Sequence, residues 1–198
     1  MLEDLRSPFR KDSTMFTLRR ATPLDLDFLV MIDLKEEGIT HLTPTILSDQ
    51  EAADHRDKIL AYVAQENKAA WVFEESDAGR LVGALLCLFH DRQHDEPNEA
   101  NEFLFRFIDD SWVPPDGRFC EVFSLWVAPD VRRLHLATRL KQEMELEARR
   151  RSIRLIYTHT EERNDHVIAL NYKLGYREIR RGPIWNPIIR VSLVKTLE

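Results

Sequence analysis

Two adjacent arginines stand where a predicted strand ends and a predicted helix begins. The apolar strand ends with Val-Ala-Pro-Asp at residues 127–130, Arg132 and Arg133 follow, and an amphipathic helix begins near Leu134. The first N–H groups of a helix lack partners within the helix and lie at the positive end of its dipole. With two guanidinium groups beside them, the amides of residues 133–138 suit a diphosphate. The alternative is an arginine pair that only caps a surface turn.

The turn differs from two common phosphate-binding loops and resembles a third. It contains neither Gly-Lys-Ser/Thr nor Gly-x-Gly-x-x-Gly. It resembles the turn of the GNAT superfamily of acyl-CoA N-acyltransferases, in which a strand ends in Val-x-Pro-Asp/Glu and Arg/Gln-x-x-Gly-x-Gly/Ala opens the next helix. Arg132 to Ala137 follow this pattern except at His135, where the family usually has glycine. A second family motif, an Asn before a helix that ends in Leu-Gly-Phe/Tyr, matches Asn164 and residues 174–176, so the resemblance extends over residues 15–196.

The resemblance implies acetyl-CoA as co-substrate and no metal. The diphosphate is expected at the turn, and the pantetheine arm along the strand at Leu125 to Val127. A histidine at position 135 is bulkier than glycine, although it is able to contact a phosphate itself. The residues expected to contact the cofactor are Leu125, Trp126, Val127, Arg132, Arg133, Leu134, His135, Leu136, Ala137, Thr138, Asn164 and Asn171.

A carboxylate in the same strand is the candidate general base. Glu121 lies between Cys120 and Val122, six residues before Val127, and some family members carry a proton-accepting glutamate at the corresponding place. The attacking amine must lose a proton, because an alkyl ammonium has a pKa of about 10. Partial desolvation in so apolar a strand makes a carboxylate a better base, and a backbone N–H of the strand is expected to stabilise the oxyanion. The alternative is an edge glutamate that points into solvent.

The group that protonates the departing thiolate is less clearly defined. Many family members carry a tyrosine four residues before the glycine of the Leu-Gly-Phe/Tyr ending, where this chain has Asn171. Asn171 shares its spacing with Val167, Leu170 and Leu174, so it faces inward and is able to bind coenzyme A, but it cannot act as an acid. Tyr172 is therefore the second catalytic candidate. A thiol with a pKa of about 8.5 needs little help to leave.

Two neighbouring features each allow two interpretations. His90 and His94 are four residues apart among acidic residues, a spacing that suits a metal on a helix, but this segment is predicted to be a loop. Residues 91–117 carry eight acidic and two basic side chains. This acidic insert either forms part of the acceptor site and favours a cationic amine, or is a solvated surface loop.

The elements that position these residues follow from the hydrophobic periodicity. The sequence predicts strands over residues 15–22, 69–76, 80–90, 118–127, 153–160, 176–181 and 188–198. It predicts helices over residues 22–38, 48–67, 136–150 and 164–175. Strands alternate with helices in the second half, which predicts an α/β (α+β) fold with a mixed central sheet. The resemblance implies the GNAT fold, with about six or seven strands flanked by about four helices.

Bulk composition narrows the class of protein. The 198 residues are 43% hydrophobic and 31% charged, and the net charge of −6 disfavours nucleic acid as a partner. No apolar run is long enough to span a membrane, and the first residues lack the apolar core of a signal peptide. Cys87 and Cys120 lie in apolar strands, which indicates reduced core residues and a cytoplasmic protein. We expect residues 1–14 to be a flexible lead-in and residues 15–198 to form one domain.

These observations predict an acetyl-CoA-dependent N-acetyltransferase that transfers an acetyl group to a primary amine of a small molecule or a peptide. Two alternatives remain open. The first is a GNAT-fold module that binds acyl-CoA without turnover, which the departures at His135 and Asn171 favour. The second is a regulatory protein whose acidic insert docks a basic partner. The oligomeric state is also open, although homodimers are common in the family.

Overall fold

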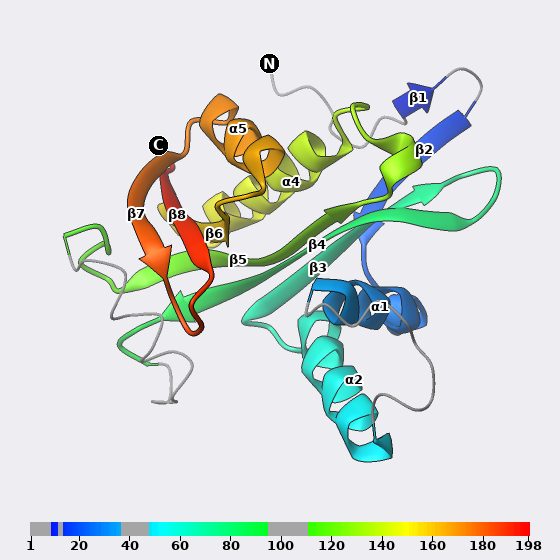
Figure 1. The fold of residues 1–198 in the computed structure, drawn as a ribbon, viewed down its shortest axis with the longest axis horizontal. Helices are drawn as coiled ribbons and strands as arrows, with labels where there is room; N and C mark the ends of the chain where they lie inside the picture. Colours follow the sequence, from blue (N-terminus) through cyan, green and yellow to red (C-terminus); the bar gives the residue numbers. More distant parts are fainter. Residues whose placement is uncertain (1–8, 12–13, 37–47, 95–110) are drawn as a thin grey trace. The chain divides into compact units, whose positions relative to one another are not determined.

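A computed structural model of the chain describes residues 9–11, 14–36, 48–94 and 111–198 (Figure 1). The chain divides into two compact units, which are described separately below. The first unit contains Met1–Cys87 and Ser124–Lys141, and the second contains Leu88–Phe123 and Gln142–Glu198. Strands β4 and β5 and helix α4 each have one part in either unit. The prediction of one domain over residues 15–198 therefore stays a prediction.

The described residues form eight strands and four α-helices, close to the predicted pattern. The strands are β1 (Phe9–Lys11), β2 (Thr14–Arg20), β3 (Lys68–Glu75), β4 (Arg80–Asp91), β5 (Arg118–Val127), β6 (Leu155–Glu161), β7 (Arg177–Pro183) and β8 (Ile189–Thr196). The helices are α1 (Leu26–Glu36), α2 (Asp49–Ala64), α4 (Leu136–Arg150) and α5 (Asp165–Lys173), with short 3-10 helices at Pro23–Asp25 and Pro129–Val131. The mixed sheet flanked by helices is as predicted, and β1 adds one short strand within the segment predicted to be a lead-in.

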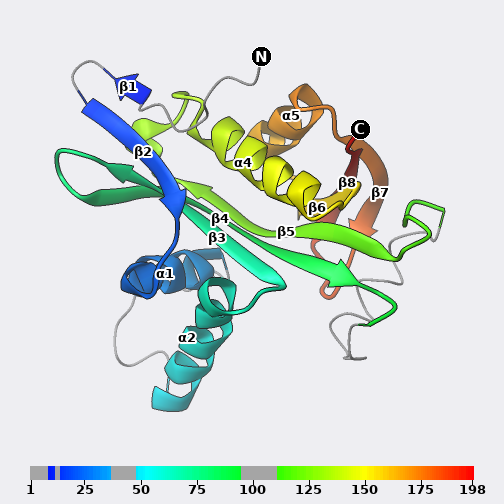
Figure 2. The ribbon, with the colours of Figure 1, turned by 180° about the vertical axis from the view of Figure 1, so that it is seen from behind.

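In the first unit, the strand order is β1-β2-β3-β4-β5, and β2 pairs antiparallel with both β1 and β3. Helices α1 and α2 lie on one face of these strands, and the first residues of α4 lie on the other (Figures 1 and 2). The buried carboxylate of Asp33 in α1 joins the two helices, because it pairs with His55 and Lys58 of α2 at 2.8 Å each. This unit carries the turn that leads from β5 into α4.

In the second unit, the strand order is β4-β5-β6-β8-β7. Strand β6 runs parallel to β5, with Cys120 opposite Ile156 and Glu121 opposite Tyr157, and β8 pairs antiparallel with β6 and β7. An ion pair of 2.7 Å between Glu145 and Lys195 joins α4 to β8. The parallel register places Glu121 and Tyr157 side by side on one face of the sheet.

Local sequence signals account for several element boundaries. Ser48 caps α2 by accepting a hydrogen bond from the N–H of Glu51, and the Glu51 carboxylate accepts one from the N–H of Ser48, which is a capping box. The β3–β4 hairpin turns at Gly79, whose φ of 64° is a left-handed value that glycine adopts without strain. Helix α5 ends at Lys173, Gly175 follows with φ 85°, and the N–H of Tyr176 donates to the carbonyl of Asn171.

The core contains the residues that the periodicity selects. Leu136, Leu140 and Met144 form the predicted stripe of α4 and are buried. Cys87 and Cys120 are buried and carry free thiols, as predicted. Gly38, predicted to end the first helix, lies outside the described residues, as do most of the predicted lead-in and residues 95–110 of the acidic insert.

Candidate functional site

The strand–helix turn, residues 128–138 of the first unit, leads into helix α4, which begins at Leu136 as the predicted range of 136–150 has it. The start near Leu134, from which the anion site was placed, is two residues early. The reason is the backbone of the preceding residues, because Arg133 and His135 have φ angles of 66° and 61°. An α-helix requires φ near −63°, so no helix can include either residue.

The left-handed residues shape the donors of the strand–helix turn. His135 is the residue before the helix, and its carbonyl accepts the first helical hydrogen bond, from the N–H of Arg139 at 3.1 Å. The N–H groups of Leu136 to Thr138 consequently have no partner within α4. Arg132 is extended, with φ −64° and ψ 161°, and the left-handed residues Arg133 and His135 follow it before the helix begins. The side chains of Arg132, Arg133 and His135 are exposed.

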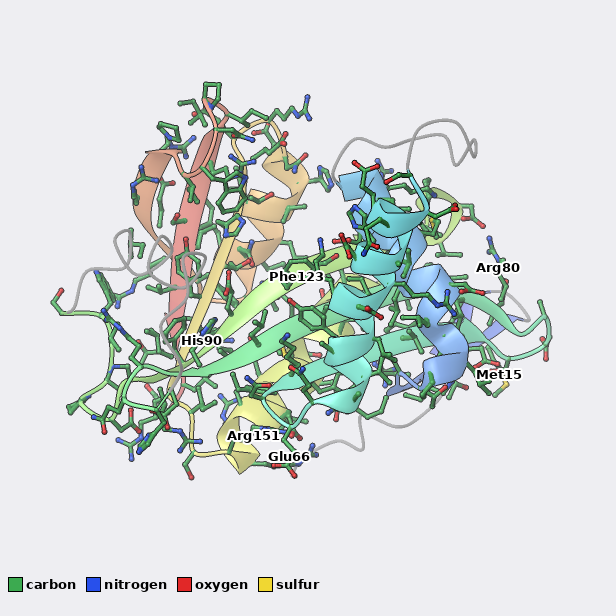
Figure 3. The ribbon with its side chains drawn as sticks, turned by 90° about the horizontal axis from the view of Figure 1, so that it is seen from below. Met15, Glu66, Arg80, His90, Phe123 and Arg151 are labelled. Carbon is green, nitrogen blue, oxygen red and sulfur yellow. The ribbon has the colours of Figure 1, made fainter. Side chains whose placement is uncertain are left out.

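An ion-pair chain fixes the start of the strand–helix turn. Arg80, at the beginning of β4 (Figure 3), bonds Asp130 at 2.7 Å and Glu75 at 2.8 Å. The hydrogen bonds to Asp130 and then to Glu75 raise the pKa of the Arg80 guanidinium above its ordinary value. The Nε of Arg132 donates to the carbonyl of Val127 at 3.2 Å, which ties the turn back to the end of β5. All of these groups are at the surface, where ion pairs contribute little to stability, so their effect is to orient the turn.

The last residues of β5 pack closely against β4 and against side chains of α1. A Cβ atom at Gly83 of β4 would lie 3.4 Å from the carbonyl oxygen of Trp126 and 3.5 Å from Cγ2 of Val127, so the two strands approach closely here. The indole of Trp126 meets the ring of Phe28 edge-on at 5.8 Å. The ammonium of Lys35 lies 5.3 Å from the centre of the same indole, a cation–π contact. Trp126 is thus a packed side chain that still has partial exposure.

A second group of polar side chains, which we call the Glu121 cluster, lies in the second unit. It consists of Glu121, His90, Tyr157, His159 and Ser192. The Nε2 of His90 lies 2.8 Å from Oε2 of Glu121, and the two side chains are 4% and 12% exposed. The interpretation of Glu121 as an edge glutamate in solvent is therefore wrong.

Tyr157 and His159 continue the cluster along β6. Side chains two residues apart on a strand share a face, so His159 lies on the same face as Tyr157 and Glu121. The Tyr157 hydroxyl lies 3.1 Å from the hydroxyl of Ser192, and burial raises the pKa of Tyr157 to about 12. Burial lowers the pKa of His159, so its imidazole is neutral at pH 7. Among the described residues, no hydrogen-bond partner faces the buried Nδ1 of His159.

The remaining predicted residues lie on α5 and at its start. Asn171 is fully buried, as its spacing predicts. Asn164 precedes the helix, and its amide donates to the hydroxyl of Thr160 at 3.2 Å. Tyr172 is 47% exposed, and its hydroxyl donates to Glu178 at 2.7 Å, which raises the pKa of Tyr172. A raised pKa makes Tyr172 a weaker proton donor, and the structure does not join it to the Glu121 cluster through any described contact.

The sequence identified Glu121 of this cluster and did not assign His90, Tyr157, His159 or Ser192 to it. The sequence paired His90 with His94, but His94 is exposed and bonds Asp91 at 3.0 Å, whereas His90 bonds Glu121. No group of three or more His, Cys, Asp or Glu side chains that suits a metal ion occurs in the part of the chain that the structure describes. Within that part there is also no helix that combines the length and the apolar character needed to cross a membrane.

A family model shows the family of this chain, and solved structures show its fold. The model of the acetyltransferase (GNAT) family matches residues 37–176. A comparison with curated protein sequences finds no significant match. Among solved structures, Arabidopsis thaliana NAA60 in complex with acetyl-CoA is similar with a TM-score of 0.65 and 16% identity, over 92% of this chain and 98% of that chain.

Two bacterial structures are similar to the same extent. The ribosomal-protein-alanine N-acetyltransferase from Brucella melitensis gives a TM-score of 0.60 at 21% identity, over 91% of this chain and 99% of that chain. The ribosomal-protein-S18-alanine N-acetyltransferase from Escherichia coli gives 0.59 at 14% identity, over 93% and 95%. At these identities the likeness shows the fold.

Proposed function

The chain belongs to the GNAT acetyltransferase family, and we propose that it is an acetyl-CoA-dependent N-acetyltransferase that acylates a primary amine by direct attack on the thioester. The observation that carries the proposal is the backbone of the strand–helix turn. Arg133 and His135 hold left-handed conformations at positions where no glycine makes them easy. Such strain costs about 1–3 kcal/mol per residue and is found where a functional geometry demands it.

The strand–helix turn is the proposed site of the coenzyme A diphosphate. The N–H groups of Leu136, Ala137 and Thr138 are the proposed main-chain donors, and the exposed guanidinium groups of Arg132 and Arg133 add positive charge. The exposed imidazole of His135 is a further proposed phosphate contact. Leu134 is partly buried, which anchors the turn between its two exposed neighbours.

The pantetheine arm is proposed to run along β5 at Leu125 to Val127, where it takes the place of a neighbouring strand. The N–H of Ala128 donates to the carbonyl of Val82 at 2.8 Å, so the edge of β5 that faces β4 is already paired at this point. Asn164 and Asn171 are proposed as further cofactor contacts, as the family resemblance implies. Because Asn171 is fully buried, the ligand would have to reach the buried face of α5 to contact it.

The proposed reaction removes one proton from the amine and exchanges the C–S bond of the thioester for a C–N bond. The amine nitrogen attacks the thioester carbonyl, the new C–N bond forms, and the C–S bond breaks to release the thiolate of coenzyme A. Glu121 is the proposed base that takes the proton of the amine, and its side chain is only 12% exposed. A backbone N–H of β5 is the proposed donor to the oxyanion. The thiolate leaves readily because the pKa of its thiol is about 8.5.

His159 is a second candidate for the same proton. It is neutral at pH 7 because burial lowers its pKa, and no described residue bonds its buried Nδ1. Tyr172 remains only a weak candidate for an acid, because its hydroxyl already donates to Glu178. The buried thiols of Cys87 and Cys120, which form no disulfide, support a reducing compartment, and we propose the cytoplasm.

The test is thiol release from acetyl-CoA across a panel of amines that includes peptide N-termini, lysine, polyamines and small amino metabolites. Release that depends on one class of amine supports the enzyme and identifies the acceptor. A rise in Tm with coenzyme A but no release with any amine would replace the enzyme by a binding module. Neither release nor a rise in Tm would leave a regulatory protein that docks a partner through its acidic insert.

A further inference from the structure

His90 makes a direct hydrogen bond to the proposed base. His90 lies next to the end of β4 (Figure 3) and Glu121 lies in β5, both within the second unit. The distance of 2.8 Å between Nε2 and Oε2 is that of a strong hydrogen bond. Both side chains are largely removed from water, so solvent cannot easily replace this bond. The contact therefore determines how the Glu121 carboxylate is held.

The chemistry of the two atoms requires a proton between them. An unprotonated imidazole nitrogen and a carboxylate oxygen are both acceptors, and two acceptors repel one another at 2.8 Å. When Glu121 is ionised, the imidazole must donate its Nε2–H to Oε2. We propose that His90 is a positioning residue of the reaction, which orients the Glu121 carboxylate so that Oε1 receives the proton of the amine. This inference rests on the proposed function of Glu121 as base.

The imidazole of His90 is itself held in place. It stacks on the ring of Phe119, with ring centres 4.5 Å apart and planes 18° apart. Phe119 is two residues before Glu121, on the same face of β5, and it is buried against Leu155, Tyr157 and Val194. A ring packed between a buried aromatic side chain and a carboxylate has one orientation available, so the bond to Glu121 is built into the core.

Other groups of the Glu121 cluster are influenced by the charge of the carboxylate. Tyr157 has its hydroxyl at 3.1 Å from Ser192, and the Nδ1 of His159 has no hydrogen-bond partner among the described residues. The negative charge of Glu121 acts to raise the pKa of both groups, together with burial at Tyr157 and against burial at His159. Arg180 and Arg190 are the cations whose charges act on Tyr157 and His159 respectively. Within the described part of the chain, the hydrogen bond observed at Oε2 is the one from His90.

The kinetic test uses two substitutions that separate donation from packing. His90→Phe keeps a ring to stack on Phe119 but has no N–H, whereas His90→Gln places an amide N–H near the position of Nε2. We expect kcat to fall about tenfold to a hundredfold in His90→Phe, with KM for acetyl-CoA changed less than twofold, and kcat to recover substantially in His90→Gln. The acid limb of the kcat profile should move to higher pH in His90→Phe, because a carboxylate without its donor is protonated more easily.

The matched control is His94→Phe, which makes the same exchange at a histidine that is 78% exposed. It should leave kcat and its pH profile as in the wild type. Far-UV circular dichroism and Tm report whether each variant folds. If His90→Phe and His90→Gln both keep the wild-type kcat and acid limb, or lose the same activity with no shift of the limb, His90 does not position Glu121.

A spectroscopic readout keeps this inference distinct from the proposed function. In protein with 15N-labelled histidine, the wild type should show one imidazole Nε2–H proton that exchanges slowly with water. Glu121→Ala should convert it to fast exchange, while His94→Phe should not. Absence of a slow imidazole proton in the wild type overturns the assignment of donor and acceptor. Absence of thiol release in the wild type instead overturns the proposed function, and the spectrum then still decides whether His90 holds Glu121.

Discussion

The strand–helix turn and the Glu121 cluster use different parts of the chain to do their work. The turn is a continuous segment whose donors are main-chain N–H groups, and its Arg132, Arg133 and His135 side chains are exposed. The cluster takes its side chains from β4, β5, β6 and β8, and its Tyr157 and Ser192 are fully buried. One region is thus local in sequence and solvated, and the other is assembled from distant strands and largely dry.

The difference determines how each region should respond to substitution. A main-chain donor survives any change of its own side chain, so substitutions in the turn should give graded losses of affinity. A proton acceptor consists of one or two atoms, so its removal should abolish most of the chemical step and leave binding intact. Affinity should therefore be a property of the turn, and rate a property of the cluster.

The largest effect is expected from Glu121→Gln, which removes the proposed base and keeps the size of the side chain. General-base catalysis contributes about 10²–10⁴-fold to a rate, so kcat should fall by about that factor. The Kd for coenzyme A, measured by isothermal titration calorimetry, should change less than twofold. A variant that keeps more than half of the wild-type kcat would move the role of base to His159, which His159→Gln then tests with the same assay.

A smaller effect, on the Kd for coenzyme A rather than on kcat, is expected from the double substitution Arg132→Ala/Arg133→Ala. Hydrogen bonds to charged groups contribute about 1.5–3 kcal/mol when well formed, and exposure reduces this, so the Kd for coenzyme A should rise about tenfold to a hundredfold. The kcat at saturating acetyl-CoA should stay within about twofold of the wild type. Fragments of coenzyme A that lack the diphosphate should lose this difference between variant and wild type, whereas dephospho-coenzyme A, which keeps the diphosphate, should retain it.

The control for charge is Arg163→Ala, because Arg163 is an exposed arginine that pairs with Glu161 in the second unit. Its removal should leave the Kd unchanged. If the double variant binds coenzyme A as tightly as Arg163→Ala does, the diphosphate binds elsewhere. Affinity would then not be a property of the turn.

A still smaller effect separates the two regions by pH. Burial lowers the pKa of His159, so the unfolded chain, with an ordinary histidine pKa of about 6.5, takes up a proton before the folded chain does. Its stabilising contribution is therefore present above pH 6.5 and is lost as the pH falls through 6.5 toward the folded value. In His159→Gln, the free energy of unfolding should fall less steeply between pH 7 and pH 5, by at most about 1.4 kcal/mol per pH unit.

The exposed counterpart is His135 in the strand–helix turn. His135→Asn keeps a side chain that tolerates a left-handed backbone, and it should leave the pH dependence of the free energy of unfolding as in the wild type. Urea unfolding at several pH values measures both slopes. Equal slopes for wild type and His159→Gln would show that the buried imidazole is already protonated at pH 5, contrary to the effect of its burial.

The same contrast explains what the sequence could predict. The turn is a continuous segment, so its arginines could be identified from the sequence alone. The buried stripe of α4 and the inward orientation of Asn171 likewise follow from helical spacing. The exact backbone of the turn does not, because no glycine marks the left-handed residues at Arg133 and His135. The helix range of 136–150 was predicted correctly, whereas the start near Leu134 used to place the donors was two residues early. The partner of Glu121 could not be predicted, because His90 is 31 residues away and the pairing of separate strands is set by packing rather than by a turn.

The smallest expected effect tests whether the turn depends on its main chain. His135 has a φ of 61°, a conformation that costs a residue with a side chain about 1–2 kcal/mol, while glycine adds about 0.5–1 kcal/mol of entropy cost on folding. His135→Gly should therefore raise the free energy of unfolding by up to about 1 kcal/mol, measured by urea denaturation. Leu134→Gly is the matched change at a neighbour without a left-handed φ, and it should lower the free energy of unfolding.

The affinity of His135→Gly for coenzyme A then decides which part of His135 matters. If main-chain donors bind the diphosphate, the Kd should be unchanged or lower, since glycine allows closer approach of the backbone to a phosphate. A Kd that rises about fivefold or more would mean that the imidazole itself contacts the phosphate, at an interaction energy of about 1 kcal/mol. The turn would then depend on a side chain, as the Glu121 cluster does, and the two regions would differ only in their exposure to water.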